Sequence, residues 1–470
     1  MDAGENKTMG INPAEMEKRA KAIRDSVQAR SVTAEQVGGL FLDIVKASCN
    51  PIAGRYWNEL NSTPIAAGYY GDLQALRDLP KKLGLGRYLV TDDRKRRKLH
   101  PQDSTRFEDG SPAALDGSMG QCMWCWNAHY FTTWKEGNNT VMAVSFAPID
   151  GKDSIYIPEG GISWMDVGVI DRETGMLCSV ISESERYRGG GGSALTEGVG
   201  VLPQYSMLGM PATGVTRELA SEYARKRGDG WEANWYVARA VIEYLFEIIM
   251  GTRNSQDPFS PELDENGLYH GGFGMGASDF PNWEEYNGLY PLIPTHAGAA
   301  AGDGVTVSDY GVLYTDGSLI KILKIPVFFG LVGAGYGNLG RMVSGLTIVA
   351  ESRSSEVFIA PSLYAGANTT VDKMSRVAVL AQSSGWIRTK SYKGLCCVPQ
   401  SFGGTATTYY SDMYTCITDN DGEYMRVAGL NLFELGSIGI SSSMIITGQE
   451  VAPFFTAPLC YFAEDPKIQL

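Results

Sequence analysis

The chain has 470 residues, of which 44% are apolar and 20% charged, and its formal net charge is −13. A chain of this length and composition can bury a sizeable core, which excludes global disorder. The acidic balance argues against a general nucleic-acid or anionic-membrane binder, because both need basic surfaces. Eight Cys in so long a chain do not form a disulfide framework.

The first 50 residues predict two short amphipathic helices. Asn12-Pro13-Ala14-Glu15 has the pattern of a helix start, and a second capping box begins at Thr33. Two such helices cannot bury their apolar stripes alone, so they need either the rest of the chain or copies of themselves. We expect residues 1–50 to be a helical anchor or oligomerisation segment. The N-terminus has no apolar core of a signal peptide, and we expect no transmembrane span.

The remaining chain divides into a polar segment and a long α+β region. We interpret residues 51–118 as a shoulder or linker. Residues 119–470 predict early strands, two helices, and then a long series of Gly-rich irregular strands. The predicted helices are Arg217–Arg227 and Trp235–Met250. The predicted strands are Cys122–Trp134, Val141–Ala147, Ile155–Ile157, Leu319–Phe329, Leu346–Ala350, Val357–Ala360, Val377–Ala381 and Gly394–Val398.

Motifs that would carry catalysis or metal binding are weak. Cys122 and Cys125 form a lone CxxC in an aromatic run, and buried thiols explain them better than a metal or redox pair. Gly335–Gly340 matches GxGxxG, but the β-branched residues that follow predict no helix to hold a pyrophosphate. We therefore expect no catalytic residues, no metal and no cofactor.

Two further clusters have both a functional and an ordinary explanation. Arg94–Lys98 is basic, and a solvated loop or subunit contact explains it better than nucleic-acid binding. Asp279, Glu284 and Glu285 lie among aromatic residues on a Gly-rich loop, as in a sugar-cleaving groove, yet ordinary loop packing explains them better.

Several stretches resemble phage and prophage receptor-binding fibre proteins with a C-type-lectin-like domain of the formylglycine-generating-enzyme lineage. They are Gly228–Gln256, Gly267–Gly276, Pro458–Pro466, Arg106–Asn127 and the opening Arg24–Ser48. The resemblance implies a C-type-lectin-like fold of two helices plus irregular antiparallel sheets, preceded by the helical anchor. It also implies a homotrimer in a virion that displays a variable surface, diversified by a retroelement, to a host receptor. The lineage's catalytic cysteine arrangement has no counterpart here, so its activity is not carried over.

We place the candidate variable region in residues 428–456. Diversified asparagine-type codons can yield the residues at ten candidate ligand-binding positions. These are Leu430, Leu432, Phe433, Leu435, Ser437, Ile438, Ile440, Ser442, Phe454 and Phe455. Such codons cannot yield Glu434, Met444, Gln449 or Glu450, which are fixed scaffold or evidence against diversification. An exposed apolar patch would indicate a binding site, whereas the ordinary interpretation of such a stretch is a core strand, with faces alternating.

The leading hypothesis is a non-enzymatic virion fibre subunit, made in the host cytoplasm. It would bind a host cell-surface protein or polysaccharide and contact other virion proteins through the N-terminal helices. We expect neither nucleic-acid binding nor membrane insertion. Two alternatives stay open: a fibre depolymerase that cuts capsular polysaccharide, and a structural decoration protein without a ligand.

Overall fold

The fold comes from a computed structural model. The structure describes residues 18, 20–23, 37–38, 50–187, 189, 208–263, 265, 267, 269, 293–313, 319–333, 339–351, 354–363, 369–380, 382–416, 420–429, 439–448 and 455–468. The predicted helical anchor at 1–50 lies almost wholly outside these residues. Lys18, residues 20–23 and residues 37–38 are helical. None of the helices that the structure describes is long and apolar enough to cross a membrane.

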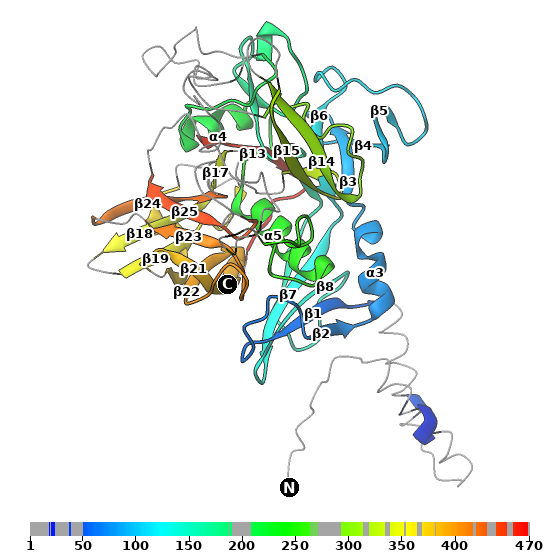
Figure 1. The fold of residues 1–470 in the computed structure, drawn as a ribbon, viewed down its shortest axis with the longest axis vertical. Coiled ribbons are helices and arrows are strands. Elements are labelled where there is room, and N and C mark those ends of the chain that lie inside the picture. Colours follow the sequence, from blue (N-terminus) through cyan, green and yellow to red (C-terminus); the bar gives the residue numbers. More distant parts are fainter. Residues whose placement is uncertain are drawn as a thin grey trace.

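A five-stranded antiparallel sheet forms one end of the body (Figure 1). In spatial order its strands are β2 (Gly68–Gly71), β1 (Ala53–Asn58), β8 (Asn139–Ser145), β7 (His129–Glu136) and β9 (Ser154–Ile157). Helix α3 (Leu73–Lys82) follows β2 and begins where Asp72 accepts a hydrogen bond from the Ala75 N–H at 2.8 Å. This cap satisfies one of the free donors of the first turn.

A seven-stranded sheet joins early and late parts of the chain. In spatial order its strands are β13 (Trp231–Ala233), β27 (Leu459–Phe462), β10 (Gly160–Ser163), β6 (Gln121–Trp126), β3 (Gly86–Val90), β4 (Arg96–His100) and β5 (Asp103–Phe107). β27 pairs with β10 on one side and β13 on the other. Helix α4 (Arg217–Arg225) lies near its β13 edge and packs against β13.

Helix α5 (Tyr236–Met250) is the central element of the core (Figure 1). Its apolar residues cover most of its circumference, so nearly every residue is buried, as expected of a helix surrounded by protein. It ends at Gly251, whose φ of 69° lies in the left-handed region that favours glycine. Phe131 of β7 stacks on Tyr244 of α5 with ring centroids 4.2 Å apart, which attaches the five-stranded sheet to the helix.

The largest sheet lies on the other side of α5 and has ten strands. Along its main path they are β20 (Ser375–Leu380), β19 (Ser354–Ile359), β18 (Leu346–Glu351), β24 (Gly422–Ala428), β25 (Ser443–Thr447), β23 (Met413–Cys416), β21 (Gly385–Ser391) and β22 (Val398–Phe402). Off this path, β17 (Gly340–Met342) pairs with β24, and β26 (Phe455–Thr456) pairs with β17. Smaller sheets are formed by β14 (Val305–Leu313), β15 (Leu319–Phe328) and β16 (Leu331–Val332), and by β11 (Val169–Asp171) and β12 (Met176–Cys178).

The expected C-type-lectin-like α+β fold is wrong. Among the residues that the structure describes, the fold is mostly β, with 43% strand against 15% helix, and the strands form several large antiparallel sheets. Regular pairing explains the difference, because the late strands expected to be irregular instead make long hydrogen-bonded ladders such as β18–β19 and β24–β25. Residues 51–118, interpreted as a shoulder or linker, contribute β1 and β3, which pair with β8 and β6 of the following segment.

Most individual elements agree with the sequence. Both helices are confirmed, as α4 and α5, each to within a few residues. The predicted strand Cys122–Trp134 is instead two strands, β6 and β7, which belong to different sheets. The strand predicted over Gly394–Val398 is wrong, because that segment begins with a 3-10 turn at Lys393–Leu395 and the strand starts only at Val398.

Candidate functional site

Seven of the ten predicted ligand-binding positions lie outside the described residues. They are Leu430, Leu432, Phe433, Leu435, Ser437, Ile438 and Phe454. The three described positions are buried: Ile440 is 3% exposed, Ser442 0% and Phe455 1%. Buried side chains at these three positions belong to the core and offer no contact to a ligand. Glu434, Gln449 and Glu450 are also outside the described residues, as are Asp279, Glu284 and Glu285 of the possible sugar-cleaving loop.

The two cysteines of the CxxC are buried thiols, as predicted. Cys122 packs in the main core cluster, whereas Cys125 packs in the second cluster on the other face of β6. Residues three apart on a strand point to opposite faces, so this pair cannot bind one metal ion. The segment after Gly340 forms strands β17 and β18, which confirms that no helix follows the GxGxxG motif.

The basic cluster Arg94–Lys98 is engaged within the chain. Arg96 lies 2.8 Å from Glu159, and Arg97 lies 2.6 Å from Asp109. Arg94 donates hydrogen bonds to the carbonyl oxygens of Phe462 and Ala463, each at 3.0 Å. These contacts account for the cations without an external partner.

An aromatic face on the five-stranded sheet is the clearest candidate for a binding surface. The strand register places Tyr70, Tyr56, Trp134, Tyr130 and Tyr156 on the same side of the sheet, across β2, β1, β7 and β9. We call these five residues the aromatic face. The opposite side of the sheet carries the residues that pack on α5. They are Ala53, Trp57, Phe131, Met142 and Val144.

The rings of the aromatic face form two contacting pairs. Tyr70 and Trp134 meet edge to face with centroids 5.0 Å apart, and Tyr130 and Tyr156 lie 5.3 Å apart. The ammonium of Lys152 sits 5.0 Å above the Trp134 ring, a cation–π contact that fixes the ring from one side. Tyr156 is 40% exposed and the other four rings are partly exposed. A row of part-exposed Tyr and Trp is the composition typical of interface centres.

The hydroxyl groups of this face can donate hydrogen bonds. Partial burial, and then the carboxylate of Glu136, raise the pKa of Tyr70. Partial burial, with Glu464 nearby, raises the pKa of Tyr156. Both phenols therefore stay protonated at neutral pH. Between the rings, the buried Thr132 donates a hydrogen bond to Ser154 at 2.8 Å, so this hydroxyl is used within the sheet.

The sequence contains a pattern that indicates this face, but the prediction of one strand over Cys122–Trp134 obscured it. Side chains two residues apart share a face, so one continuous strand would place Trp124, Tyr130 and Trp134 on the same face. The chain instead turns between β6 and β7, which buries Trp124 and leaves Tyr130 and Trp134 partly exposed. The aromatic residues at alternate positions of β7 are the pattern that could have revealed the surface.

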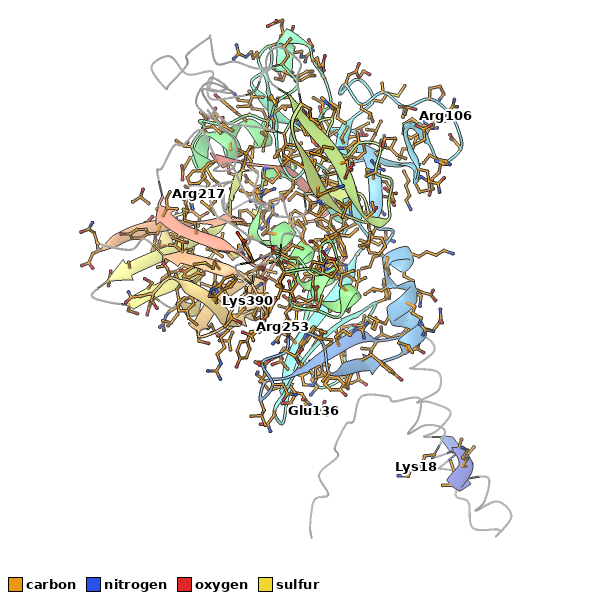
Figure 2. All side chains as sticks on the ribbon, viewed as in Figure 1. Lys18, Arg106, Glu136, Arg217, Arg253 and Lys390 are labelled. Carbon is orange, nitrogen blue, oxygen red and sulfur yellow. The ribbon has the colours of Figure 1, made fainter. Side chains whose placement is uncertain are left out.

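A network of buried charged side chains lies where α5 meets the ten-stranded sheet. Glu243 accepts from Arg426 and Lys390, and all three side chains are enclosed. Lys390 also donates to the Ser441 hydroxyl at 2.9 Å, while Arg253 bridges Glu247 and Glu59. Lys390 and Arg253 lie beside the helix in Figure 2. Because each charge has a buried partner, this network connects helix and sheet and presents nothing to an external ligand.

Asp412 and His129 are two further buried titratable groups in this region. Burial raises the pKa of Asp412 to about 7, although the Ser441 N–H donates to it at 3.0 Å. Burial lowers the pKa of His129 to about 4. The neutral ring donates from Nδ1 to the Asn127 carbonyl at 2.7 Å and accepts at Nε2 from the Tyr244 hydroxyl at 2.5 Å.

No protein-family model matches the chain. No curated protein matches it either.

Proposed function

We propose that this protein is an attachment subunit of a virion that binds a host cell-surface polysaccharide through its aromatic face. The observation that carries the binding role is the row of five partly exposed Tyr and Trp rings on one side of a sheet whose other side is core. The virion setting, the trimer and the contact of the N-terminal helices with other virion proteins rest on the sequence resemblance.

The chemistry of the aromatic face favours a sugar polymer with little charge. A sugar ring has a face of C–H groups that stacks on an aromatic ring and a rim of hydroxyls that hydrogen-bonds to neighbouring polar groups. The aromatic face offers both, because its partly exposed Tyr rings also carry hydroxyl groups that stay protonated at neutral pH. Tyr and Trp also lose little conformational entropy on binding, since each has only two side-chain torsions. Several copies in one fibre would raise a modest affinity through avidity.

Binding to an array of purified bacterial surface polysaccharides tests the proposal. Trp134→Ala and Tyr156→Ala should each weaken saturable binding by about tenfold or more, as expected for aromatic hot spots. Tyr69→Ala is the matched control. Tyr69 is 48% exposed on the same edge strand as Tyr70 but faces the other side, so its removal should leave binding unchanged. Melting temperatures of all three variants should stay near that of the unchanged protein.

Three results would contradict the proposal. Absence of saturable binding to every polysaccharide would favour a structural virion protein. Release of reducing sugar ends would favour the depolymerase. Unchanged binding by Trp134→Ala and Tyr156→Ala, with a polysaccharide bound, would place the binding surface elsewhere on the molecule.

A further inference from the structure

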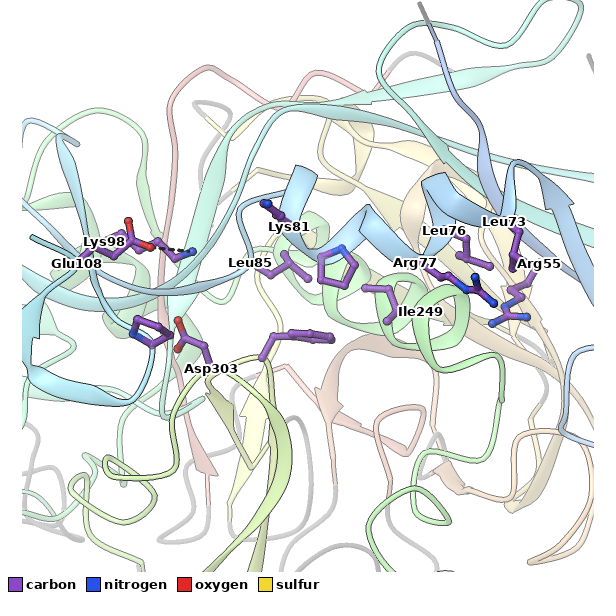
Figure 3. A pocket seen from close by; sticks show the side chains of 13 residues that line it. Arg55, Leu73, Leu76, Arg77, Lys81, Leu85, Lys98, Glu108, Ile249 and Asp303 are labelled. Atoms are coloured by element: carbon purple, nitrogen blue, oxygen red, sulfur yellow. Dashed lines mark ion pairs between the residues drawn. The ribbon is translucent and has the colours of Figure 1, made fainter. Parts of the chain in front are cut away.

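A second candidate site is a cleft on the side of the body where α3 meets the end of α5. Its volume is about 670 Å³, and its walls come from β1, α3, α5 and the segments around β4 and β15 (Figure 3). This cleft is separate from the aromatic face, since Arg55 on β1 points to the opposite side of the sheet from Tyr56. A volume of this size accepts a molecule much larger than a simple ion.

Positive charge exceeds negative charge in the cleft. Four cationic side chains line it, namely Arg55, Arg77, Lys81 and Lys98, against the carboxylates of Glu108 and Asp303. Both carboxylates already have partners in the protein. Glu108 lies 3.5 Å from Lys98, and Asp303 lies 3.0 Å from the buried guanidinium of Arg87. In a chain of net charge −13, a cleft with surplus cations is a local departure from the overall charge.

Arg55 and Arg77 form the basic end of the cleft. Their guanidinium groups point toward each other in Figure 3, beside Leu73 and Leu76. Among the described residues, no carboxylate pairs with Arg55, Arg77 or Lys81. Two facing guanidinium groups repel each other unless an anion lies between them, and their planar donors match the oxygens of a phosphate or carboxylate.

Arg55 is held in place to receive such an anion. Its Nε donates to the Ile248 carbonyl at 3.2 Å, near the C-terminal end of α5 where a cation is favoured. The guanidinium also packs against Gly251, where an added Cβ would approach Nη2 to 3.2 Å. These contacts fix the side chain and occupy only one of its five donors. Partial burial lowers the pKa of Arg55, and no carboxylate offsets this effect.

The rest of the cleft is apolar in the middle and polar at the far end. Leu85 and Ile249 lie in the middle, and the Lys98–Glu108 pair lies at the end opposite Arg55 (Figure 3). Pro80 and Phe329 add to the apolar lining of the cleft. A ligand with an anionic group at one end, a ring with an apolar face, and hydroxyls at the other end would use all three regions.

We propose that this cleft binds a sugar-sized organic anion, with its phosphate or carboxylate group held between Arg55 and Arg77 and its ring over the apolar middle. This site is independent of polysaccharide binding by the aromatic face. A phosphorylated sugar and a uronic acid share the required chemistry, so the experiment contains one arm for each source.

Isothermal titration calorimetry with four probes tests the site. Glucose 1-phosphate and glucuronate represent the two sources, and inorganic phosphate and glucose each supply half of the expected ligand. We expect saturable binding of at least one sugar anion, no binding of glucose, and inorganic phosphate weaker by about tenfold or more, because it leaves the apolar middle unused. Added salt should weaken binding, since Arg77 and Lys81 are exposed.

Arg77→Gln is the decisive variant and Lys82→Gln its control. Arg77 is exposed, so its replacement should leave the fold intact while weakening the binding of the sugar anion by about tenfold or more. Lys82 is exposed in the same helix but does not line the cleft, and its replacement should change affinity little. Tyr156→Ala should not affect this titration, which separates this site from the aromatic face.

Three outcomes would overturn the inference. The first is that the folded protein gives no saturable heat with either sugar anion. The second is equal affinity of Arg77→Gln and the unchanged chain. The third is inorganic phosphate binding as tightly as the sugar anions, which would show that the apolar middle takes no part.

Discussion

Arg426 of β24 and Glu243 of α5 form an ion pair in the interior, with Nη2 and Oε1 2.6 Å apart and side chains 1% and 0% exposed. Burial alone would raise the pKa of Glu243, but Arg426 and Lys390 outweigh it and hold the pKa below its ordinary value. The carboxylate is therefore charged, and it joins two strands of the large sheet to the central helix. Removing one partner of such a group leaves the others as uncompensated buried charges.

Glu243→Gln should destabilise the protein by about 3–5 kcal/mol, because Arg426 and Lys390 would both lose their main carboxylate. Chemical denaturation measures the change in unfolding free energy. Asp309→Asn is the control: Asp309 pairs with Lys324 at 2.7 Å on the surface, with both side chains more than half exposed. Loss of an exposed pair should cost less than about 1 kcal/mol. Equal effects of the two substitutions would show that the buried network adds no special stability.

Asp412 should make stability fall as pH rises from about 4 to 7. Its folded-state pKa of about 7 lies above the ordinary value of 3.8, so the folded state keeps the proton over a range in which the unfolded chain has lost it. The stability that protonated Asp412 contributes is fully present below pH 4 and is lost as pH rises to about 7. The unfolding free energy should change by at most ~1.4 kcal/mol per pH unit in this range.

Asp412→Asn removes this titration. The difference in unfolding free energy between the variant and the unchanged protein should therefore shift in the variant's favour from pH 4 to pH 7.5. Denaturant titrations at several pH values measure it. A difference independent of pH would mean that Asp412 titrates normally despite its burial.

His129 should change stability with pH in the opposite direction. Its folded-state pKa of about 4 lies below the ordinary 6.5, so its contribution is complete above pH 6.5 and is lost as pH falls toward 4. His129→Gln should flatten the decline in stability between pH 6.5 and 4, measured by thermal unfolding. The prediction fails if the variant follows the same profile as the parent protein.

Local structure was largely predictable from the sequence. The helix stripe from Ala238 to Ile249 and the stop at Gly251 define α5 nearly to the residue, because helix periodicity and glycine termination are local properties. The buried thiols of Cys122 and Cys125 followed from their aromatic surroundings.

Tertiary pairing was not predictable in the same way. Nothing near Leu459 in the sequence indicates that its strand inserts between β10 and β13, since the partners of a strand are chosen by the whole sheet. Apolar periodicity also does not predict the role of Glu243. It is a charged residue on an otherwise apolar helix, and its partners lie in distant strands. The aromatic face was missed because the turn between β6 and β7 changes which alternate residues face the core.

The position of β27 inside the seven-stranded sheet has a consequence for synthesis. β10 ends at Ser163, yet the strand that completes its hydrogen bonds begins only at Leu459. While the ribosome makes the intervening chain, the edge of β10 offers unpaired N–H and C=O groups to any neighbouring strand. The nascent protein should therefore be prone to wrong strand pairing and aggregation until β27 has been made.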